Sequence, residues 1–211
     1  MGNHWHNLDE IEISNRLRKG NDTFVPRFAD IPADSELIKL VPGKPRPAAV
    51  LIPLLRQENG WYVLFTRRNA GLTEHSGQVA FPGGRADPED RGPEQTALRE
   101  AYEEIGLNPA DVRILGRLKD YITITNYRVT PVVGVIPWPY PIHPANDEVS
   151  HVFTIPLEWL ANPLNREERL RVLPAPFSPI PVIYYHPFEG ETLWGASARF
   201  VLALIETLED R

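Results

Sequence analysis

Three glutamates lie close together in a short segment of the sequence that has clear helix boundaries. Pro93 suits the first turn of a helix and Gly106 suits the residue that ends one, so the sequence predicts a helix between them. Glu100 lies three positions before Glu103 and four before Glu104, which places all three carboxylates on one helical face. Like charges so placed repel by a few tenths of a kcal/mol per pair on an exposed helix. A hard divalent cation relieves this repulsion best, since Mg²⁺ prefers oxygen ligands.

The acidic cluster also has a plainer interpretation, which is a solvated helix face. Taken alone, such a cluster is more often a solvated face than a metal site. The residues around it favour the metal site. A Gly-Gly turn precedes the helix at residues 83–84, and Arg99 and Gly106 flank the glutamates at particular offsets.

Residues 83–107 resemble the Nudix box, Gly-x5-Glu-x7-Arg-Glu-U-x-Glu-Glu-x-Gly-U, in which U is aliphatic. From Arg99 to Leu107 every specified position matches, with Ala101 as a small aliphatic residue. The first half departs in two ways. Asp90 stands where the box has glutamate, and eight residues rather than seven separate it from Arg99. We therefore expect the loop to bulge by one residue, and the part that Asp90 takes in the site stays open.

The resemblance implies an enzyme that hydrolyses a pyrophosphate linkage with Mg²⁺ or Mn²⁺ as its cofactor. By the resemblance, Glu100, Glu103 and Glu104 bind or position the metal, Gly84 belongs to the metal site, and Arg99 orients a glutamate through a salt bridge. A water held by the metal and a carboxylate base would attack one phosphorus, and the metal would neutralise charge on the phosphate oxygens. Positioning and electrostatics would then supply most of the acceleration.

The stretch just upstream points to a particular branch of that family. Residues 64–84 (LFTRRNAGLTEHSGQVAFPGG) look like the signature of coenzyme A diphosphatases, with Thr-x-Arg, Leu-x-x-His-x-Gly-Gln and Phe-Pro-Gly-Gly in order. Residues 193–199 (LWGASAR) are similar to the Trp-Gly-x-Thr-Ala-Arg segment of that branch. The resemblance implies hydrolysis of CoA or acyl-CoA to 4′-phosphopantetheine and adenosine 3′,5′-bisphosphate. One position departs, because Thr73 stands where the branch usually has a basic residue.

Five residues are candidates for contacts with this small-molecule substrate. Arg67, Arg68 and Arg85 could hold phosphate, since guanidinium groups bind phosphate in a bidentate manner. The alternative, for Arg67 or Arg68, is pairing with surface carboxylates, and it has nearly even odds. His75 could contact phosphate, but a turn-stabilising role is favoured, and Gln78 could touch substrate or pair a buried backbone group.

An acidic loop after the central strands supplies one further candidate. Glu148 in the Asp147-Glu148-Val149 stretch could approach the site as an additional metal ligand or as the base. An exposed loop acid is an equally good interpretation.

Two other functions remain as alternatives. One is a Nudix hydrolase for ADP-ribose, dinucleotides or nucleoside triphosphates. The other is a catalytically silent nucleotide-binding regulator, which is disfavoured because all three glutamates are present.

Composition excludes several other classes of protein. The chain has no cysteine, which excludes disulfides, thiolate zinc sites and cysteine nucleophiles. Its formal net charge of −6 disfavours binding to nucleic acid or to anionic membranes. No secretory signal is recognisable and no apolar run approaches the ~20 residues that span a bilayer, so we expect a soluble cytoplasmic protein. The sequence leaves the oligomeric state open between a monomer and a homodimer.

Periodicity and turn residues predict an α+β fold, and the resemblance narrows it to a Nudix-like α/β/α sandwich with a mixed β-sheet between helices. A single domain over residues 1–211 is expected, with an N-terminal helical extension over about residues 1–46. That extension begins with a helix over 7–19, which has Leu8, Ile11 and Leu17 on one face. The expected strands are 48–55 and 61–67 (a hairpin through Asn59-Gly60), 78–81, 112–125, 127–136, and 182–186 with 191–194 (a second hairpin); the expected helices are 93–105 and 196–208, with helical turns at 157–160 and 165–170.

Overall fold

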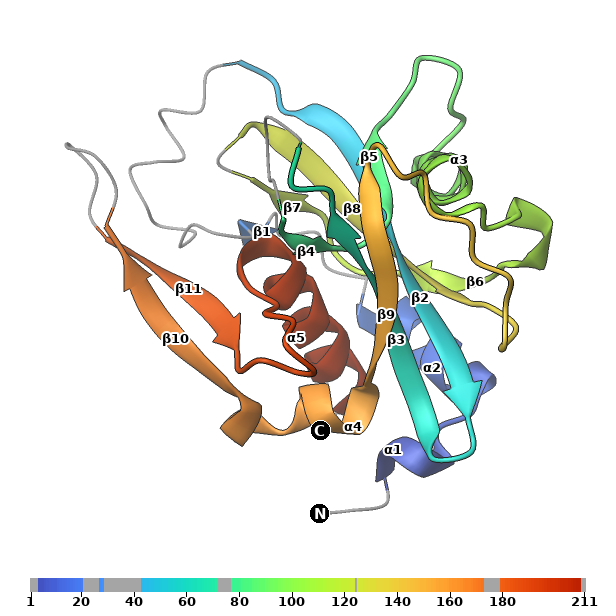
Figure 1. The fold of residues 1–211 in the computed structure, drawn as a ribbon, viewed down its shortest axis with the longest axis vertical. Helices are drawn as coiled ribbons and strands as arrows, with labels where there is room; N and C mark the ends of the chain where they lie inside the picture. The colour runs from blue at the N-terminus through green and yellow to red at the C-terminus, as the bar shows by residue number, and fades with distance from the viewer. Residues whose placement is uncertain are drawn as a thin grey trace.

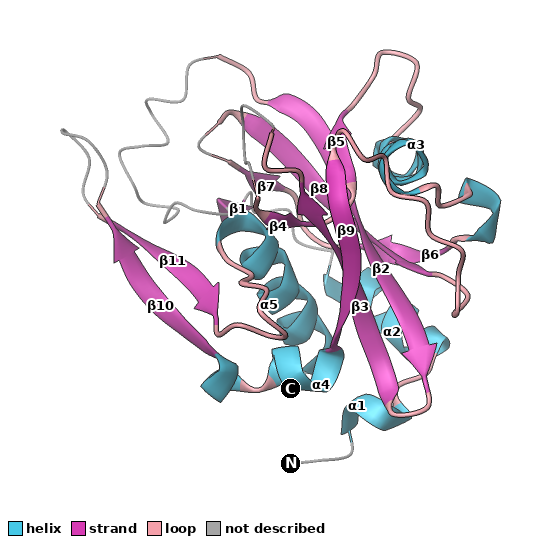
Figure 2. Cartoon of the chain, in the orientation of Figure 1, coloured by secondary structure: helices cyan, strands magenta, loops and turns pink. Residues whose placement is uncertain are grey.

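The computed structural model of residues 1–211 describes residues 4–20, 27–28, 43–71, 77–123, 125–172 and 179–209. Figures 1 and 2 show a twisted sheet with helices on both faces and a separate two-stranded ribbon beside it. The helices are α1 (His4–Asn7), α2 (Glu10–Gly20), α3 (Pro93–Ile105), α4 (Leu157–Ala161) and α5 (Gly195–Glu209). The strands are β1 (Arg27–Phe28), β2 (Arg46–Gln57), β3 (Gly60–Arg68), β4 (Val79–Ala80), β5 (Gly83–Arg85), β6 (Arg113–Arg117), β7 (Tyr121–Ile122), β8 (Tyr127–Val135), β9 (Val149–Pro156), β10 (Arg166–Arg171) and β11 (Ile180–Tyr185). Short 3₁₀ turns span Pro109–Asp111 and Pro163–Asn165.

The main sheet is mixed. In the described part of the chain its strands run in the order β1-β7-β8-β2-β3-β4, with β5 on β2, β6 on β8 and β9 on β3. Strands β2 and β8 are parallel, whereas β3 is antiparallel to both β2 and β9. This arrangement confirms the predicted α+β layering around a mixed sheet.

Strand β2 is apolar along most of its length because both of its faces are covered. Leu51 and Leu55 pack toward α3, and Ile52 and Leu54 pack toward the layer that contains α2 and α5. All four side chains are fully buried. The sequence from 48 to 55 therefore reads as a continuous apolar run rather than an alternating one, and the predicted strand and its hairpin into β3 are confirmed.

The N-terminal helices are part of the packed molecule. Asp9 starts α2 by accepting a hydrogen bond from the Glu12 amide (2.7 Å), and the Trp61 indole on β3 donates to the Leu8 carbonyl (2.8 Å). The predicted helix over 7–19 is confirmed in its main part, but its predicted apolar face was wrong at one position, where Ile11 is 74% exposed.

Helical spacing explains the error at Ile11. Ile13 precedes Leu17 by one turn and is fully buried with it, whereas Ile11 lies on the far side of the helix. Leu8 is also buried, as predicted, but it precedes the helix.

Two strand predictions in the main sheet need correction. The predicted strand over 112–125 is two strands, β6 and β7, which both pair with β8 but are separated by residues 118–120, and β6 itself contains a bulge between Ile114 and Gly116. The predicted strand over 78–81 ends at Ala80, and Gly83–Arg85, predicted as a turn, is β5 paired with β2. Strand β9 was not predicted.

The C-terminal half contains two further corrections. Residues 165–170, predicted as a helical turn, form β10, and tertiary pairing with β11 outweighs the local helical preference. The predicted hairpin between 182–186 and 191–194 is present only in part. Two antiparallel bridges, Tyr184 to Trp194 and Phe188 to Glu191, and a hydrogen bond from the Tyr185 amide to the Leu193 carbonyl (2.8 Å) join its two sides, whereas residues 191–194 form no continuous strand and β11 pairs along its length with β10. The final helix is confirmed as α5.

In the described residues, no helix is both long and apolar enough to cross a bilayer. The prediction of one domain with an N-terminal extension stays a prediction.

The two isoleucines of α2 provide a matched pair for testing this packing. Ile13→Ala is expected to lower the free energy of unfolding by about 2–5 kcal/mol, since it leaves a cavity between α2, β6 and α5. Ile11→Ala, on the exposed face, is expected to change it by less than about 0.5 kcal/mol. Urea denaturation of both variants measures the difference, and equal losses would contradict the assignment of the buried face.

Candidate active site

The Gly-Gly segment brings β5 directly against helix α3. Gly84 pairs with Ala49 on β2, and a Cβ atom added to Gly84 would lie 2.5 Å from an oxygen of Glu100. A Cβ on Gly83 would likewise lie 2.5 Å from the Ala49 carbonyl. The Gly83 amide donates a hydrogen bond to the Glu104 carboxylate. The two glycines thus let the backbone approach the first and last of the three glutamates.

The boundaries of α3 are those expected from the sequence. Pro93 lies in the first turn, and Gly106 adopts the left-handed conformation (φ 69°), where its amide reaches the carbonyls of Ala101 and Tyr102. Ala97 and Ala101 pack the helix on the sheet. The glutamate face consequently lies beside β5 at the edge of this packed surface.

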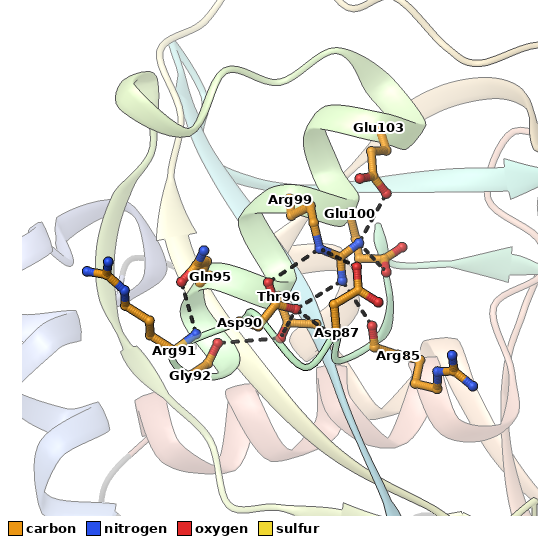
Figure 3. Close-up of polar contacts among 10 residues, drawn as sticks. All are labelled: Arg85, Asp87, Asp90, Arg91, Gly92, Gln95, Thr96, Arg99, Glu100 and Glu103. Carbon is orange, nitrogen blue, oxygen red and sulfur yellow. Dashed lines mark hydrogen bonds and ion pairs between the residues drawn. The ribbon is translucent and has the colours of Figure 1, made fainter.

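Arg99 is the centre of a polar network on this face (Figure 3). Its guanidinium donates to Asp90 (Nη2 to Oδ2, 3.0 Å), Glu100 (2.9 Å), Glu103 (3.1 Å) and the Arg85 carbonyl (3.0 Å). The predicted salt bridge from Arg99 to a glutamate is therefore present with two of them.

Asp90 is the buried partner of Arg99. Its side chain is 3% exposed and also accepts hydrogen bonds from the Thr96 hydroxyl and the Asp87 amide, both at 2.9 Å. The Arg99 guanidinium holds the pKa of Asp90 below its usual value. Asp90 therefore has a part in the site despite the altered spacing, which is to hold Arg99. It does so from a turn in which its own amide donates to the Asp87 carbonyl.

Glu104 is a buried ionisable group. Its side chain is 4% exposed, and burial raises its pKa from 4.5 to about 8, against the opposing effect of the Arg68 cation. The charges on Glu100 and Glu148 raise it further. Burial also raises the pKa of Glu100, and Glu103 and Glu148 add to that shift. Glu103, in contrast, is 55% exposed.

The loop before β9 carries Glu148 to this site. The Ala145 amide donates to the Glu104 carbonyl, and the Asn69 amide at the end of β3 donates to the Glu148 carbonyl, both at 2.8 Å. Glu148 is exposed, but its carboxylate is close enough to raise the pKa of the buried Glu104 and of the partly buried Glu100. The structure therefore brings Glu148 together with Glu100 and Glu104.

The predicted substrate residues differ in where they lie. Arg68 faces the site, with Nη1 3.7 Å from Glu104 and a buried Nε that has no hydrogen-bond partner in the described residues. Arg67 instead pairs with Glu191, and the Arg85 side chain points away from the Arg99 network (Figure 3). The Gln78 carbonyl accepts from the Arg68 amide (2.9 Å). His75 lies outside the described residues.

The donor chemistry of the site fits a hard divalent cation. Mutually repelling carboxylates with raised pKa values, Glu104 buried and Glu100 partly buried, are stabilised by such an ion. The missing side chain of Gly84 lets the Glu100 carboxylate lie directly against the backbone of β5. Within the described residues, however, no three acidic, histidine or cysteine side chains already converge as a ligand set. Arg99 holds one oxygen each of Glu100 and Glu103 in the observed arrangement.

Comparisons with known proteins agree with this geometry. A sequence profile for the family described as NUDIX domain matches residues 44–175. The chain is 37% identical over 174 residues to the Pectobacterium atrosepticum protein named uncharacterized Nudix hydrolase NudL, covering 79% of this chain and 84% of that protein. It is 48% identical over 112 residues to the Escherichia fergusonii protein of the same name, covering 53% and 58%. The structure of a MutT/nudix family protein from Enterococcus faecalis, 14% identical, covers 80% of this chain and 64% of its own with a TM-score of 0.51, which shows the same fold.

Asp90→Asn tests the buried ion pair. We expect a loss of about 1–3 kcal/mol in the free energy of unfolding near neutral pH, since the charged hydrogen bonds to Arg99 are weakened. Because the folded protein keeps Asp90 ionised at a pH where the unfolded chain protonates it, this contribution is present above the ordinary aspartate pKa and is lost as the pH falls through the lowered one. The difference from wild type should therefore shrink in acid.

Urea unfolding at several pH values measures this difference. Asp87→Asn is the control, since Asp87 is 54% exposed and 3.6 Å from Arg99. A loss as large in the control, or a difference that grows in acid, would contradict the assignment.

Glu104→Gln tests the cost of burying a carboxylate. The pKa of Glu104 is raised in the folded state, so without divalent cations the stability of wild type should fall as the pH rises from 4.5 toward about 8. The glutamine variant should show a weaker fall over that range. Thermal unfolding in a chelator across this range checks it, with the exposed Glu103→Gln as control. Identical pH slopes in wild type and Glu104→Gln would refute the burial argument.

Proposed function

Because the chain belongs to the Nudix hydrolase family, which acts on pyrophosphate bonds, we propose that its substrate is CoA or acyl-CoA. The products are 4′-phosphopantetheine and adenosine 3′,5′-bisphosphate. The observation that carries the chemistry is the buried Glu104 carboxylate, which lies among the charges of Glu100, Glu148 and Arg68. The choice of substrate rests on the two sequence blocks at residues 64–84 and 193–199.

In this proposal Glu100, Glu103 and Glu104 hold Mg²⁺ or Mn²⁺ beside Gly84. When bound, the ion supplies Lewis-acid stabilisation of the charge that develops on the phosphate oxygens. Arg99 keeps Glu100 and Glu103 oriented, and Asp90 anchors Arg99 from the buried side. Burial of Glu104 strengthens every electrostatic interaction at this point, because the local dielectric is low.

Glu148 is proposed as the group that takes the proton from the attacking water. It lies on an exposed loop and its charge couples to Glu100 and Glu104, so its carboxylate is both accessible and near the reacting region. A carboxylate held this way contributes general-base catalysis by position. Its role as an additional metal ligand is the alternative.

Arg68 is proposed as the principal phosphate ligand. Its buried Nε lacks a hydrogen-bond partner in the described residues, and its Nη1 is 3.7 Å from Glu104, so a guanidinium with unused donor capacity lies beside the carboxylates. Arg85, His75 and Gln78 are proposed as further contacts. The absence of a basic side chain at Thr73 favours ADP-ribose, dinucleotides or nucleoside triphosphates as the second candidate substrate class.

Hydrolysis of a substrate panel tests this function. CoA, acetyl-CoA, ADP-ribose, NADH and nucleoside triphosphates are incubated with the protein and Mg²⁺ or Mn²⁺, and the products are separated by chromatography. We expect the highest kcat/KM for CoA or its thioester, with 4′-phosphopantetheine as a product. Glu104→Gln is expected to lower kcat by about 10²–10⁴-fold, the scale of losing a positioned catalytic group.

Two outcomes would contradict parts of the proposal. A higher kcat/KM for ADP-ribose than for CoA would overturn the substrate assignment alone. Near-normal turnover by Glu104→Gln would overturn the assignment of the active site.

A further inference from the structure

A second charged cluster lies at the end of β3, on the C-terminal side of the molecule. Glu191 belongs to the turn between β11 and α5, and its carboxylate accepts from Arg67 (Nη1 to Oε2, 2.5 Å) and contacts His151 (Nε2 to Oε1, 3.0 Å). The Glu191 side chain is only 15% exposed, whereas Arg67 is 35% and His151 48% exposed. One partly buried acid thus joins two more exposed nitrogen donors from different strands.

This cluster is connected to the proposed active site through two strands. Arg67 directly precedes Arg68, which lies 3.7 Å from Glu104. Across the strand pair, Arg67 lies opposite His151, which follows Glu148 by three residues. Glu191 therefore contacts Arg67 on β3, the strand that carries Arg68, and His151 on β9, the strand that follows Glu148.

The bulge in β9 fixes the side chain of His151. The register shifts between Arg67 and Arg68, which leaves Ser150 without a strand partner. The Ser150 hydroxyl lies 3.1 Å from the Arg67 carbonyl and 3.2 Å from His151 Nδ1. Both ring nitrogens of His151 are consequently engaged, one by Ser150 and the other by Glu191.

The turn that carries Glu191 is also held by contacts that do not involve its carboxylate. The backbone groups of Phe188 and Glu191 exchange two hydrogen bonds of 2.9 Å, and the Phe188 ring packs on Trp159 with centroids 5.0 Å apart. The backbone and the aromatic contact already hold the turn against α4 and β11. The Glu191 carboxylate is therefore available for a role other than folding.

We infer that Glu191 is a positioning residue for the proposed hydrolysis, acting through Arg67 and His151 on the binding of the anionic substrate. The inference rests on the proposed function. The ion pair with Glu191 holds Arg67 in one orientation. Because Glu191 also contacts His151, it links the end of β3 to the beginning of β9, next to Arg68 and Glu148. Loss of the contacts from Glu191 to Arg67 and His151 loosens the pairing of β3 with β9 beside Arg68 and leaves the carboxylates on α3 in place.

Glu191→Gln tests this role, because it keeps the shape and removes the charge. We expect KM for CoA to rise about fivefold to tenfold, the scale of one partly buried charged contact, while kcat changes less than about twofold. Glu191→Asp, which keeps the charge on a shorter side chain, should restore part of the loss. Glu189→Gln, an exposed acid in the same turn, is the matched control and should leave KM unchanged.

Arg67→Met and the double variant separate positioning from a structural role. If Glu191 acts through Arg67, the effect of Glu191→Gln on KM should be much smaller in the Arg67→Met background than in wild type. Additive effects would overturn the inference. A KM that falls in Glu191→Gln would also overturn it, because Glu191 would then act by repelling the substrate. A lower unfolding midpoint with no change in KM would overturn it as well, because Glu191 would then have a structural role alone.

A binding measurement keeps this test separate from the proposed function. If wild type hydrolyses none of the substrates, the proposed function fails, and the inference is judged by calorimetry with methylene diphosphonate and Mg²⁺. The Kd for this non-hydrolysable diphosphate analogue should then rise about fivefold to tenfold in Glu191→Gln, the factor expected for KM, and an unchanged Kd would overturn the inference.

Discussion

The burial of the Glu104 carboxylate is the constraint on which the rest of the site depends. A carboxylate that is 4% exposed would ordinarily become neutral, and its pKa is indeed raised to about 8. Two surrounding features oppose that shift, namely the Arg68 cation and the hydrogen bond from the Gly83 amide. The glycines in β5 are required because a Cβ on Gly84 would overlap the Glu100 carboxylate and a Cβ on Gly83 would overlap the backbone of β2. Local packing and electrostatics thus impose the same residue choices.

Arg99 is a cation among acids on the same helical face, so its charge is stabilised where that of Glu104 is opposed. Two glutamates and an aspartate surround it. The hydrogen bond with Asp90, followed by the hydrogen bond with Glu100 and the charges of these two acids, raises the pKa of the guanidinium. Asp90 is the most buried of these partners and is fixed by Thr96 and the Asp87 amide, so it anchors Arg99 from the buried side. An aspartate is one methylene shorter than the glutamate of the Nudix box, and the additional residue lies between Asp90 and Arg99.

Patterns that are local in the sequence predicted the core of this arrangement. The proline and glycine at its ends predicted α3, the glutamate spacing predicted a shared face, and Asn59-Gly60 predicted the β2–β3 hairpin. What could not be predicted depends on distant pairing. Residues 165–170 become a strand only because β11 lies beside them, and Glu191 meets Arg67 across 124 positions. Ile11 and Ile13 show the limit within one helix, because α2 begins at Glu10 rather than at residue 7, so Leu8 lies before the helix and its position does not indicate which helical face is buried.

The end of β3 joins the two layers of the molecule. Successive side chains of a strand point to opposite faces, so Arg67 and Arg68 diverge although they are neighbours. Arg68 meets Glu104 on the α3 side, and Arg67 meets Glu191 on the C-terminal side. A strand end that carried only one arginine could serve one layer alone. With both, the arginine held by Glu191 is one peptide unit from the arginine beside the buried carboxylate, and this short connection is the physical basis of the positioning role that we infer for Glu191.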